Sequence, residues 1–492
     1  MYRENKGKKA LMIAGVLMAL SMNGNAWAAG VAPQAANYRE QAVRFSLPYY
    51  EEAAGGKLTA ETLASWWQVF NDSDLTELIG MALEENKDLA VAQSRVNQAR
   101  AKLGISKSRL LPWVDGSGSW TRTKVADNSP YPQMAGLHND AKLGVDASWE
   151  IDVFGRQKAN VRASTNDFQA EQARLYGTWT SLSAETAMNY ITLRTLQEKL
   201  AIAEKNLLLQ TEKREILEAN YRAGRSAELP VKQADYTLKQ VEAEIPNLRT
   251  AIEETMNRLA ILTGKTPGEL TEKLGQKKPL PDVDTAMYLA IPADSLRQRP
   301  DIQAAERALA AQKQRTKAAK KDWLPRFSLF GSIGLESFST GSLFSAGSKG
   351  FSFGPSLTLP IFHAGEIRRN IEVQTEKEKE YLAVYEKRVQ EAVAEVRNAL
   401  TAGAQERQRK ESLQAGFQAA KDALDIADNR YRAGLSSYHD VLDAQRNVYS
   451  LDSLYTESRG QELIDMVQLF KAMGGGWQSM DNKEAERANS QK

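Results

Sequence analysis

The sequence predicts an α+β fold in which an internally duplicated chain supplies four β-strands and two hairpins of very long helices. Three observations support this prediction. The same short motifs recur in the same order in the two halves of the chain. Three segments alternate between apolar and polar side chains, which is the pattern of a strand with two different faces, and a fourth that begins at Trp113 is less regular. Long proline-free stretches rich in Ala, Leu, Gln, Glu, Lys and Arg are typical of long helices.

The composition of the 492-residue chain excludes several classes of protein. Its formal net charge is only +2, which leaves no basic excess for binding nucleic acid. It has no cysteine, so disulfides, thiolate metal sites and thiol catalysis are excluded, and its three histidines leave little room for a metal site. It has no Walker A sequence, no H-E-x-x-H and no nucleophile elbow. We therefore expect no enzyme activity, no cofactor and no metal.

The N-terminus has the pattern of a secretory signal peptide. Basic residues precede an apolar run from Ala10 to Met22, and small residues flank Trp27. This pattern predicts cleavage between Ala28 and Ala29. A membrane anchor is the alternative, but the apolar run is shorter than the ~20 residues that a spanning helix needs. We expect a secreted chain that either stays in the periplasm or crosses a membrane by β-strands.

The duplication is visible as pairs of landmarks at a nearly constant distance along the chain. The pairs are Asn86-Lys87-Asp88-Leu89 with Arg299-Pro300-Asp301-Ile302, Leu111-Pro112 with Leu324-Pro325, Ile151 to Arg156 with Leu359 to Phe362 and Gly365, and Tyr221-Arg222-Ala223-Gly224 with Tyr431-Arg432-Ala433-Gly434. From them we expect a signal peptide at 1–28, an N-terminal segment at 29–74, a first repeat at 75–264, a linker at 265–286, a second repeat at 287–475 and a C-terminal tail at 476–492.

Each repeat is expected to contain two strands and a helical hairpin. The strands are predicted at about 113–124 and 141–152, and at about 327–338 and 351–361; the hairpins are predicted at about 156–264 and 365–473. Each strand has about the ~9–11 residues that a tilted strand needs to cross a bilayer. Apolar residues recur at three-four spacing along the long helices, as in a coiled-coil seam. Such helices must pack side by side along their length.

These elements together predict an oligomeric duct. Strands that face lipid must close into a barrel, because hydrocarbon cannot satisfy an open sheet edge. One chain supplies only four predicted strands, fewer than the smallest membrane barrels contain. Three chains would give ~12 strands around a water-filled lumen, with the long helices in a ring below it. The alternative is a periplasmic coiled-coil scaffold whose strand pairs form soluble sheets, and an enzyme is a third, more distant one.

The motifs resemble those of the TolC family of outer-membrane efflux proteins, in particular its NodT-type branch, over nearly the whole mature chain. The residues that carry the resemblance are Trp66-Trp67-Gln68-Val69-Phe70 with Asp72, Leu75 and Leu78; Asp152 to Arg156; Arg299 to Ile302; Leu324-Pro325; Pro360-Ile361-Phe362; Tyr431 to Gly434; Asp440 to Ala444; and Gly474-Gly475-Gly476-Trp477. The order and the duplication of these motifs are more specific to the family than any single motif is.

The resemblance implies a homotrimer with a 12-stranded outer-membrane barrel and a long α-helical barrel in the periplasm of a Gram-negative cell. It further implies a passive channel for solutes delivered by a periplasmic adaptor protein and an inner-membrane pump. One departure concerns the anchor. Many NodT-type members resemble lipoproteins with a cysteine at the mature N-terminus, whereas this chain has none. We therefore expect the barrel alone to hold the protein in outer-membrane lipid.

The resemblance also suggests a gate at the second hairpin turn. Gly224 and Gly434 are expected to form the turns at the two hairpin tips, where glycine best adopts a left-handed backbone. In the family, aspartates matching Asp440 and Asp443 form an acidic ring at the periplasmic entrance, and a tyrosine matching Tyr431 helps to close it. The family's nearby arginine has no counterpart at Ser436. Such a ring would bind cations.

Each of the two aspartates has a simpler interpretation. Ser437-x-x-Asp440 has the spacing of a capping box, in which the acid stabilises the start of a helix. Asp443 can belong to an ordinary solvated face. The first hairpin turn has Arg225, Ser226 and Glu228 but no acidic pair. Among the strand aromatics, Trp113 suits either an interfacial girdle or packing between strands and helices.

Overall fold

A computed structural model describes residues 60–128, 130, 135–283 and 298–478. The helices and strands, in chain order, are α3 (Ala60–Ala64), η1 (Trp66–Phe70), α4 (Ser73–Glu85), α5 (Lys87–Ser108), β1 (Trp113–Val125), β2 (Gly136–Ile151), α6 (Arg156–Arg222), α7 (Leu229–Leu262), α8 (Thr271–Leu274), α9 (Pro300–Lys320), η5 (Lys321–Trp323), β3 (Arg326–Ser337), η6 (Thr340–Ser342), η7 (Ala346–Ser348), β4 (Lys349–Thr358), α10 (Glu366–Arg432) and α11 (Tyr438–Ala472). The expected cleavage position at Ala28 and Ala29 and the expected start of the second repeat at 287 lie outside the described residues.

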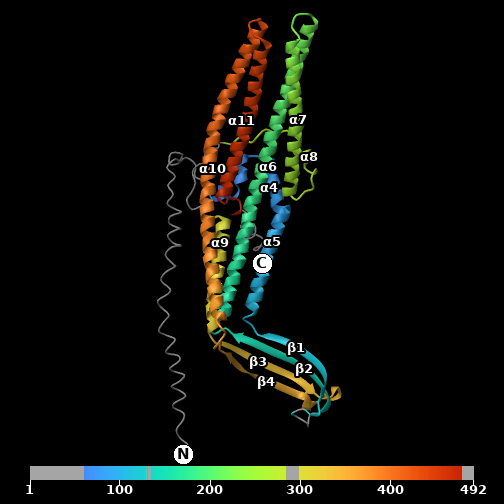
Figure 1. The fold of residues 1–492 in the computed structure, drawn as a ribbon, viewed down its shortest axis with the longest axis vertical. Coiled ribbons are helices and arrows are strands. Elements are labelled where there is room, and N and C mark those ends of the chain that lie inside the picture. Colours follow the sequence, from blue (N-terminus) through green and yellow to red (C-terminus); the bar gives the residue numbers. More distant parts are fainter. Residues whose placement is uncertain (1–59, 129, 131–134, 284–297, 479–492) are drawn as a thin grey trace, which may run out of the picture. The chain divides into compact units, whose positions relative to one another are not determined.

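The four strands form one antiparallel sheet in the order β1-β2-β3-β4, so β1 and β4 are its edges (Figure 1). β2 begins at Gly136, earlier than the expected start near 141, because its pairing with β1 continues until Val125 lies opposite Gly136. β4 ends at Thr358, before the expected end near 361. Proline has no N–H to donate to a ladder, so Pro360 cannot extend the strand, whereas Pro355 is tolerated within β4 because β4 is an edge strand.

The pairing register gives the sheet one apolar face and one polar face. Val145 lies opposite Ile333, which in turn lies opposite Phe351 on the next strand. Because successive side chains point to opposite faces, these three share one face. The other face carries Lys142 and Glu336, whose charged groups are 2.8 Å apart. Ile333 and Phe351 are 66% and 77% exposed, so nothing in the described chain covers the apolar face.

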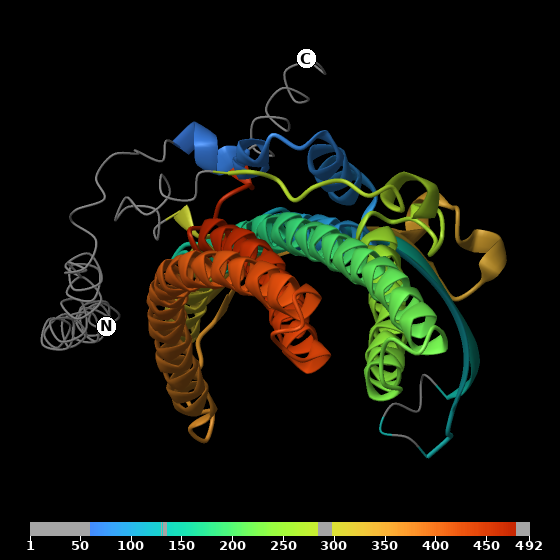
Figure 2. The same cartoon turned by 90° about the horizontal axis from the view of Figure 1, so that it is seen from above.

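The two long helices have the same length. α6 and α10 each contain 67 residues, which corresponds to about 100 Å of helix. α7 returns along α6 and α11 returns along α10, while α5 and α9 pack beside the parts of α6 and α10 next to the sheet (Figure 1). Seen from above, these helices follow an arc, and α4 lies on its convex side (Figure 2). Among the described helices, none combines the length and apolar character of a membrane-spanning segment.

Two of the sequence motifs, Trp66 to Phe70 and Gly474 to Trp477, lie close together and join the start of the described chain to its end. Trp66 is completely buried, and its ring stacks on that of Phe470 with 5.4 Å between centroids. The Gly476 N–H donates to the Leu63 carbonyl over 2.8 Å. The residues of η1 therefore hold the C-terminal end of α11 against the rest of the protein.

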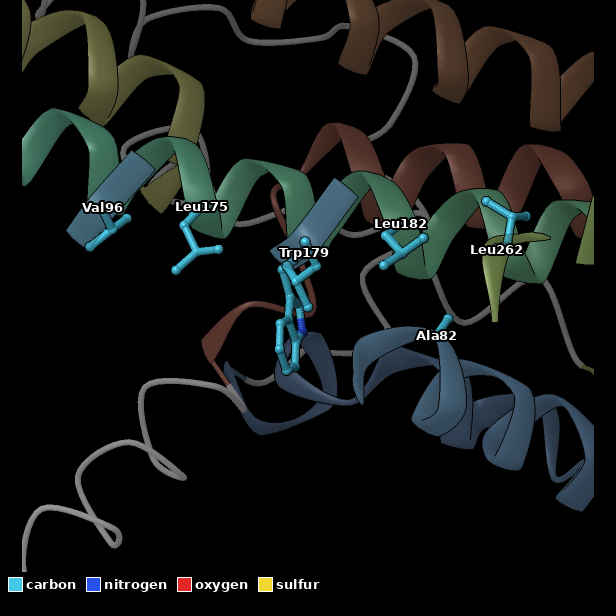
Figure 3. Close-up of a cluster of buried hydrophobic side chains, with 7 residues drawn as sticks. Ala82, Val96, Leu175, Trp179, Leu182 and Leu262 are labelled. Atoms are coloured by element: carbon cyan, nitrogen blue, oxygen red, sulfur yellow. The ribbon is translucent and has the colours of Figure 1, made fainter. Parts of the chain in front are cut away.

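A buried apolar cluster beside this clamp joins α4 and α5 to α6. Leu175, Trp179 and Leu182 line one side of α6 and contact α4 and α5 (Figure 3). The other buried members are Ala82, Leu89, Val96 and Leu262. Burial of each large apolar side chain stabilises the fold by about 1.5–3 kcal/mol. This cluster therefore holds α4 and α5 against α6.

A buried ionic group ties the chain after α8 to the same region. The Arg194 side chain is fully buried and donates to Asp74 Oδ2 over 3.0 Å, and Lys278 Nζ lies 2.6 Å from the same oxygen. Although burial opposes ionisation, Lys278 and Arg194 hold the pKa of Asp74 below its ordinary value. The ionised carboxylate thus joins α4, α6 and the segment that follows α8.

Candidate functional site at the hairpin tips

The turns at the two hairpin tips have the same geometry. Gly224 and Gly434 have φ values of +67° and +71°, in the region that favours glycine. The Gly434 N–H donates to the Tyr431 carbonyl over 2.9 Å, and the Leu435 N–H donates to the Arg430 carbonyl over 2.8 Å. The first turn repeats both bonds around Gly224. This is a Schellman motif, and it ends α6 and α10 at equivalent places.

Asp440 caps the start of α11. Its Oδ2 accepts hydrogen bonds from the Ser437 N–H over 3.0 Å and from the Ser437 hydroxyl over 3.2 Å, and the reciprocal bond completes a capping box. These contacts are those of the capping box that the spacing of Ser437 and Asp440 predicts. The carboxylate is still exposed, so capping leaves its charge at the tip.

Asp443 lies one turn further along the same face, between two basic groups. Its Oδ2 is 3.2 Å from His439 Nε2, and its Oδ1 is 3.7 Å from Arg446 Nη1. The side chain is 50% exposed. The contact with His439 is an ion pair only when the imidazole is protonated. Asp443 is thus a carboxylate with half its surface free to meet a solute.

Tyr431 belongs to an apolar cluster that joins all four helices of the two tips. Its ring lies 5.5 Å from that of Tyr438, which is 5% exposed. Burial raises the pKa of Tyr431, and burial together with Tyr431 and Asp428 raises the pKa of Tyr438 to about 12. The other members are Leu217 of α6, Val231 and Ala234 of α7, Leu424 and Ala427 of α10, and Val441 and Leu442 of α11. This cluster holds the second tip against the first.

Two polar links between α7 and α11 were not predicted from the sequence. Arg446 Nη2 donates to the Tyr236 hydroxyl over 2.7 Å, and the guanidinium lies 5.4 Å from the centre of that ring. Further along, the Tyr449 hydroxyl donates to Glu244 Oε2 over 2.7 Å. The signal for these links in the sequence is the three-residue spacing of Asp443, Arg446 and Tyr449, which places them on one face of α11. The partners of Arg446 and Tyr449 lie 210 and 205 residues away along the chain, so no local pattern identifies them.

The first tip has different chemistry. α7 begins at Leu229, with Pro230 in its first turn and no side-chain cap. Among the described residues, no cluster of three or more His, Cys, Asp or Glu side chains has the arrangement of a metal site. The first turn of α7 contains no acidic residue, so the pair Asp440 and Asp443 of α11 has no counterpart there.

Comparison with known proteins identifies the same architecture elsewhere. The family model described as outer membrane efflux protein matches residues 78–265 and 291–475. The solvent efflux pump outer membrane protein SrpC of Pseudomonas putida is 31% identical over 416 residues, which cover 84% of this chain and 88% of that protein.

Solved structures of outer-membrane channels are similar over most of the chain. The channel OprN is 32% identical with a TM-score of 0.79, covering 84% of this chain and 93% of that one. The CmeC channel of Campylobacter jejuni is 29% identical with a TM-score of 0.79, covering 86% and 91%. The residues that the family model matches include the four strands and the long helices.

Proposed function

The chain belongs to the outer membrane efflux protein family, and on that basis we propose that three copies form one duct that conducts solutes passively across the outer membrane. Membership makes the chain an outer-membrane component of an efflux pump in a Gram-negative cell, and not an enzyme. The number of copies, the barrel they form and the partners they meet are our proposals.

The observation that carries the proposal is the sheet. Its apolar face is exposed, and its edge strands β1 and β4 have unpaired backbone groups on their outer sides. In lipid those groups need partners, and pairing β4 of one copy with β1 of the next supplies them. Three four-stranded sheets would close a barrel of about 12 strands, with the polar face around water.

The helices support the same assembly. They follow an arc and do not close on themselves (Figure 2). Next to the sheet, α5 packs on α6 and α10 packs on α9, so α5 and α10 lie on opposite sides of this pair (Figure 1). In the single chain both carry exposed apolar residues, including Ile105 on α5 and Val384 on α10, which are 59% and 46% exposed. We propose that α5 of one copy packs against α10 of the next, so that three arcs form a helical tunnel in the periplasm.

The domain organisation is explained by duplication of a half-chain. Each proposed repeat, 75–264 and 287–475, contributes a shorter helix, two strands and a long helical hairpin in the same order. The matches at 78–265 and 291–475 support this division. We propose the linker at 265–286 as the connection between the two copies of the unit.

The gate proposed from the sequence involves Tyr431, Asp440 and Asp443. The links of Arg446 to Tyr236 and to Asp443 support it, because they place a basic side chain between the acid and the other hairpin. We propose that the second hairpin moves away from the first when the tunnel opens. The exposed tips would then meet a periplasmic adaptor that couples the duct to an inner-membrane pump.

Conductance in planar lipid bilayers tests the duct. We expect the purified full chain to behave as a trimer in detergent and to give discrete current steps after reconstitution. A periplasmic coiled-coil scaffold, the alternative from another class, would fractionate with soluble proteins and give none. Membrane fractionation and bilayer recording together therefore distinguish the two.

A matched pair of substitutions tests which face of the sheet meets lipid. Ile333→Lys places a charge on the apolar face, where it costs about 2–4 kcal/mol at the bilayer midplane. Ser332→Lys places the same charge on the polar face. We expect only Ile333→Lys to reduce the amount of protein in the outer membrane. Equal loss in both variants would contradict the proposed barrel.

A further inference from the structure

A cleft of about 800 Å³ lies between α5, α6, α9 and α10, in the part of the helices next to the sheet. Its size falls within the ~300–1,000 Å³ of typical small-molecule sites. Five of its lining side chains are basic and three are acidic. It lies far along α6 and α10 from the hairpin tips, so the gate does not account for its charges.

Two of the three acids are already neutralised within the cleft. Asp167 forms an ion pair with Arg315, and Glu171 forms one with Arg174. Burial raises the pKa of Asp167, and the guanidinium of Arg315 acts against that rise. The ion pair is therefore partly shielded from water. Glu380 is the remaining acid.

Three cations in the cleft have no such partner. Arg95, Lys102 and Lys377 form no ion pair within the described part of the chain. Between them lie the methyl groups of Ala99 and Ala170 and other small or aromatic side chains, so the lining is not uniformly polar. Gln312, which is 2% exposed, donates to the Gln374 side chain over 2.8 Å and fixes the floor. With five basic and three acidic side chains, the cleft thus combines a net excess of positive charge with apolar surface.

The cleft residues of α5 lie on a different face of this helix from the residues that pack toward α4, which places the cleft toward the concave side of the helical arc. Leu89 and Val96 of α5 pack in the apolar cluster with Ala82 of α4, which lies on the convex side (Figure 2). At about 100° per residue, Arg95 and Lys102 lie roughly 100–140° around α5 from those two residues. The cations therefore point away from α4. In the trimer of the proposed function, the concave side is the wall of the tunnel.

We propose that this cleft, which includes Arg95, Lys102 and Lys377, binds organic anions inside the tunnel, with one site in each copy. The location of the site inside the tunnel rests on the proposed function, whereas the chemistry of the site does not. A guanidinium offers paired donors to a carboxylate or sulfonate, and the two ammonium groups add charge without a fixed direction. The alanine methyl groups and the ring of Tyr381 would contact the apolar part of the same molecule.

Pyrene tetrasulfonate, a large aromatic anion, is a suitable probe, and a cationic pyrene of similar size is its control. The test variant is Arg95→Gln/Lys102→Gln/Lys377→Gln. The matched control is Lys107→Gln/Lys317→Gln/Lys379→Gln, which removes the same charge from the same helical layer at exposed positions outside the cleft. Fluorescence anisotropy with the full chain in detergent measures binding, and block of the current in bilayers measures access from the tunnel.

We expect the test variant to bind the anion at least about tenfold more weakly and the control variant to bind it as the natural chain does, because only the first loses the cations that face the ligand. Added salt should weaken binding to the natural chain. The single variant Lys377→Gln, at an exposed position, should weaken binding severalfold even if the triple variant assembles poorly.

Equal affinity of all variants would overturn the inference, as would tighter binding of the cationic pyrene. Binding in detergent without any bilayer current would instead contradict the proposed duct and leave the cleft in place. Binding lost in the test variant, with block of the current lost in parallel, supports both the site and its location in the tunnel.

Discussion

Arg446 of α11 donates a hydrogen bond to the Tyr236 hydroxyl of α7 over 2.7 Å, and so joins the two helical hairpins near their tips. The two residues come from different proposed repeats. The same guanidinium lies 3.7 Å from Asp443 and 5.4 Å from the Tyr236 ring, so it contacts an acid of its own helix and an aromatic of the other hairpin.

Tyr236→Phe should favour the open tunnel. The change removes the hydrogen bond to Arg446 and keeps the ring contact, at a cost of about 0.5–1.5 kcal/mol for the closed tips of each copy. We expect a larger mean conductance in planar bilayers. Tyr221→Phe, at an exposed position of the first tip, is the control. Unchanged conductance in Tyr236→Phe would show that this bond does not hold the tips together.

Asp443→Asn should weaken block of the channel by divalent cations. In the proposed trimer, three half-exposed charges are lost at the proposed entrance, while the capping box of Asp440 remains intact. We expect the cation concentration for half-block to rise about fivefold or more, a change of roughly 1 kcal/mol. Asp425→Asn, on an exposed face of α10, is the control.

Asp440 requires a separate measurement, because the same substitution removes a helix cap. Asp440→Ala should lower the free energy of unfolding by about 0.5–2 kcal/mol, the usual effect of losing a cap. Urea or thermal unfolding of the detergent-solubilised protein measures it. If block by cations weakens in Asp440→Ala with no loss of stability, the aspartate acts at the entrance and its capping contributes little.

Trp66→Ala should strongly destabilise the protein. The side chain is completely buried and stacks on Phe470, and removing such a side chain costs about 3–5 kcal/mol. We expect a much lower melting temperature, measured by circular dichroism, with loss of the proposed trimer at moderate temperature. Trp323→Ala removes a tryptophan that is 49% exposed, so it should have little effect on melting.

Asp465→Asn should stabilise the protein at neutral pH. Burial, and the neighbouring Glu406 and Glu462, raise the pKa of Asp465, whose side chain is 4% exposed. A raised pKa in the folded state means that the folded chain holds this proton more tightly than the unfolded chain. Its contribution to stability is therefore fully present below the ordinary pKa of aspartate and is lost as pH rises through the raised value.

The pH dependence of that variant provides the check. We expect Asp465→Asn to gain about 0.5–2 kcal/mol at neutral pH, within the usual range for a single substitution, and to match the natural chain in acid, where Asp465 is protonated. Gln461 can still donate its hydrogen bond to the asparagine carbonyl. A stability difference that is the same at all pH values would contradict the assignment to this carboxyl.

Local patterns were sufficient for the elements of the fold. Alternation places Val145, Ile333 and Phe351 on one face of the sheet because the side-chain period of a strand is two. The glycines at 224 and 434 predicted both hairpin turns, because each stands where the backbone must become left-handed. The start of β2 was placed too late, because the partner strand and not its own sequence decides how far a ladder extends.

The sequence by itself predicted the long helices, the strands and the family, since each depends on residues close together in the chain or on motifs in a fixed order. Only the tertiary structure decided how far the strand ladder extends and which side chains from distant parts of the chain meet. The contact of Arg446 with Tyr236, the stacking of Trp66 on Phe470 and the cations of the four-helix cleft join distant segments. The reason is physical: a helix face has no preferred partner until two long helices pack, and the packing then brings together residues that no spacing along the chain relates.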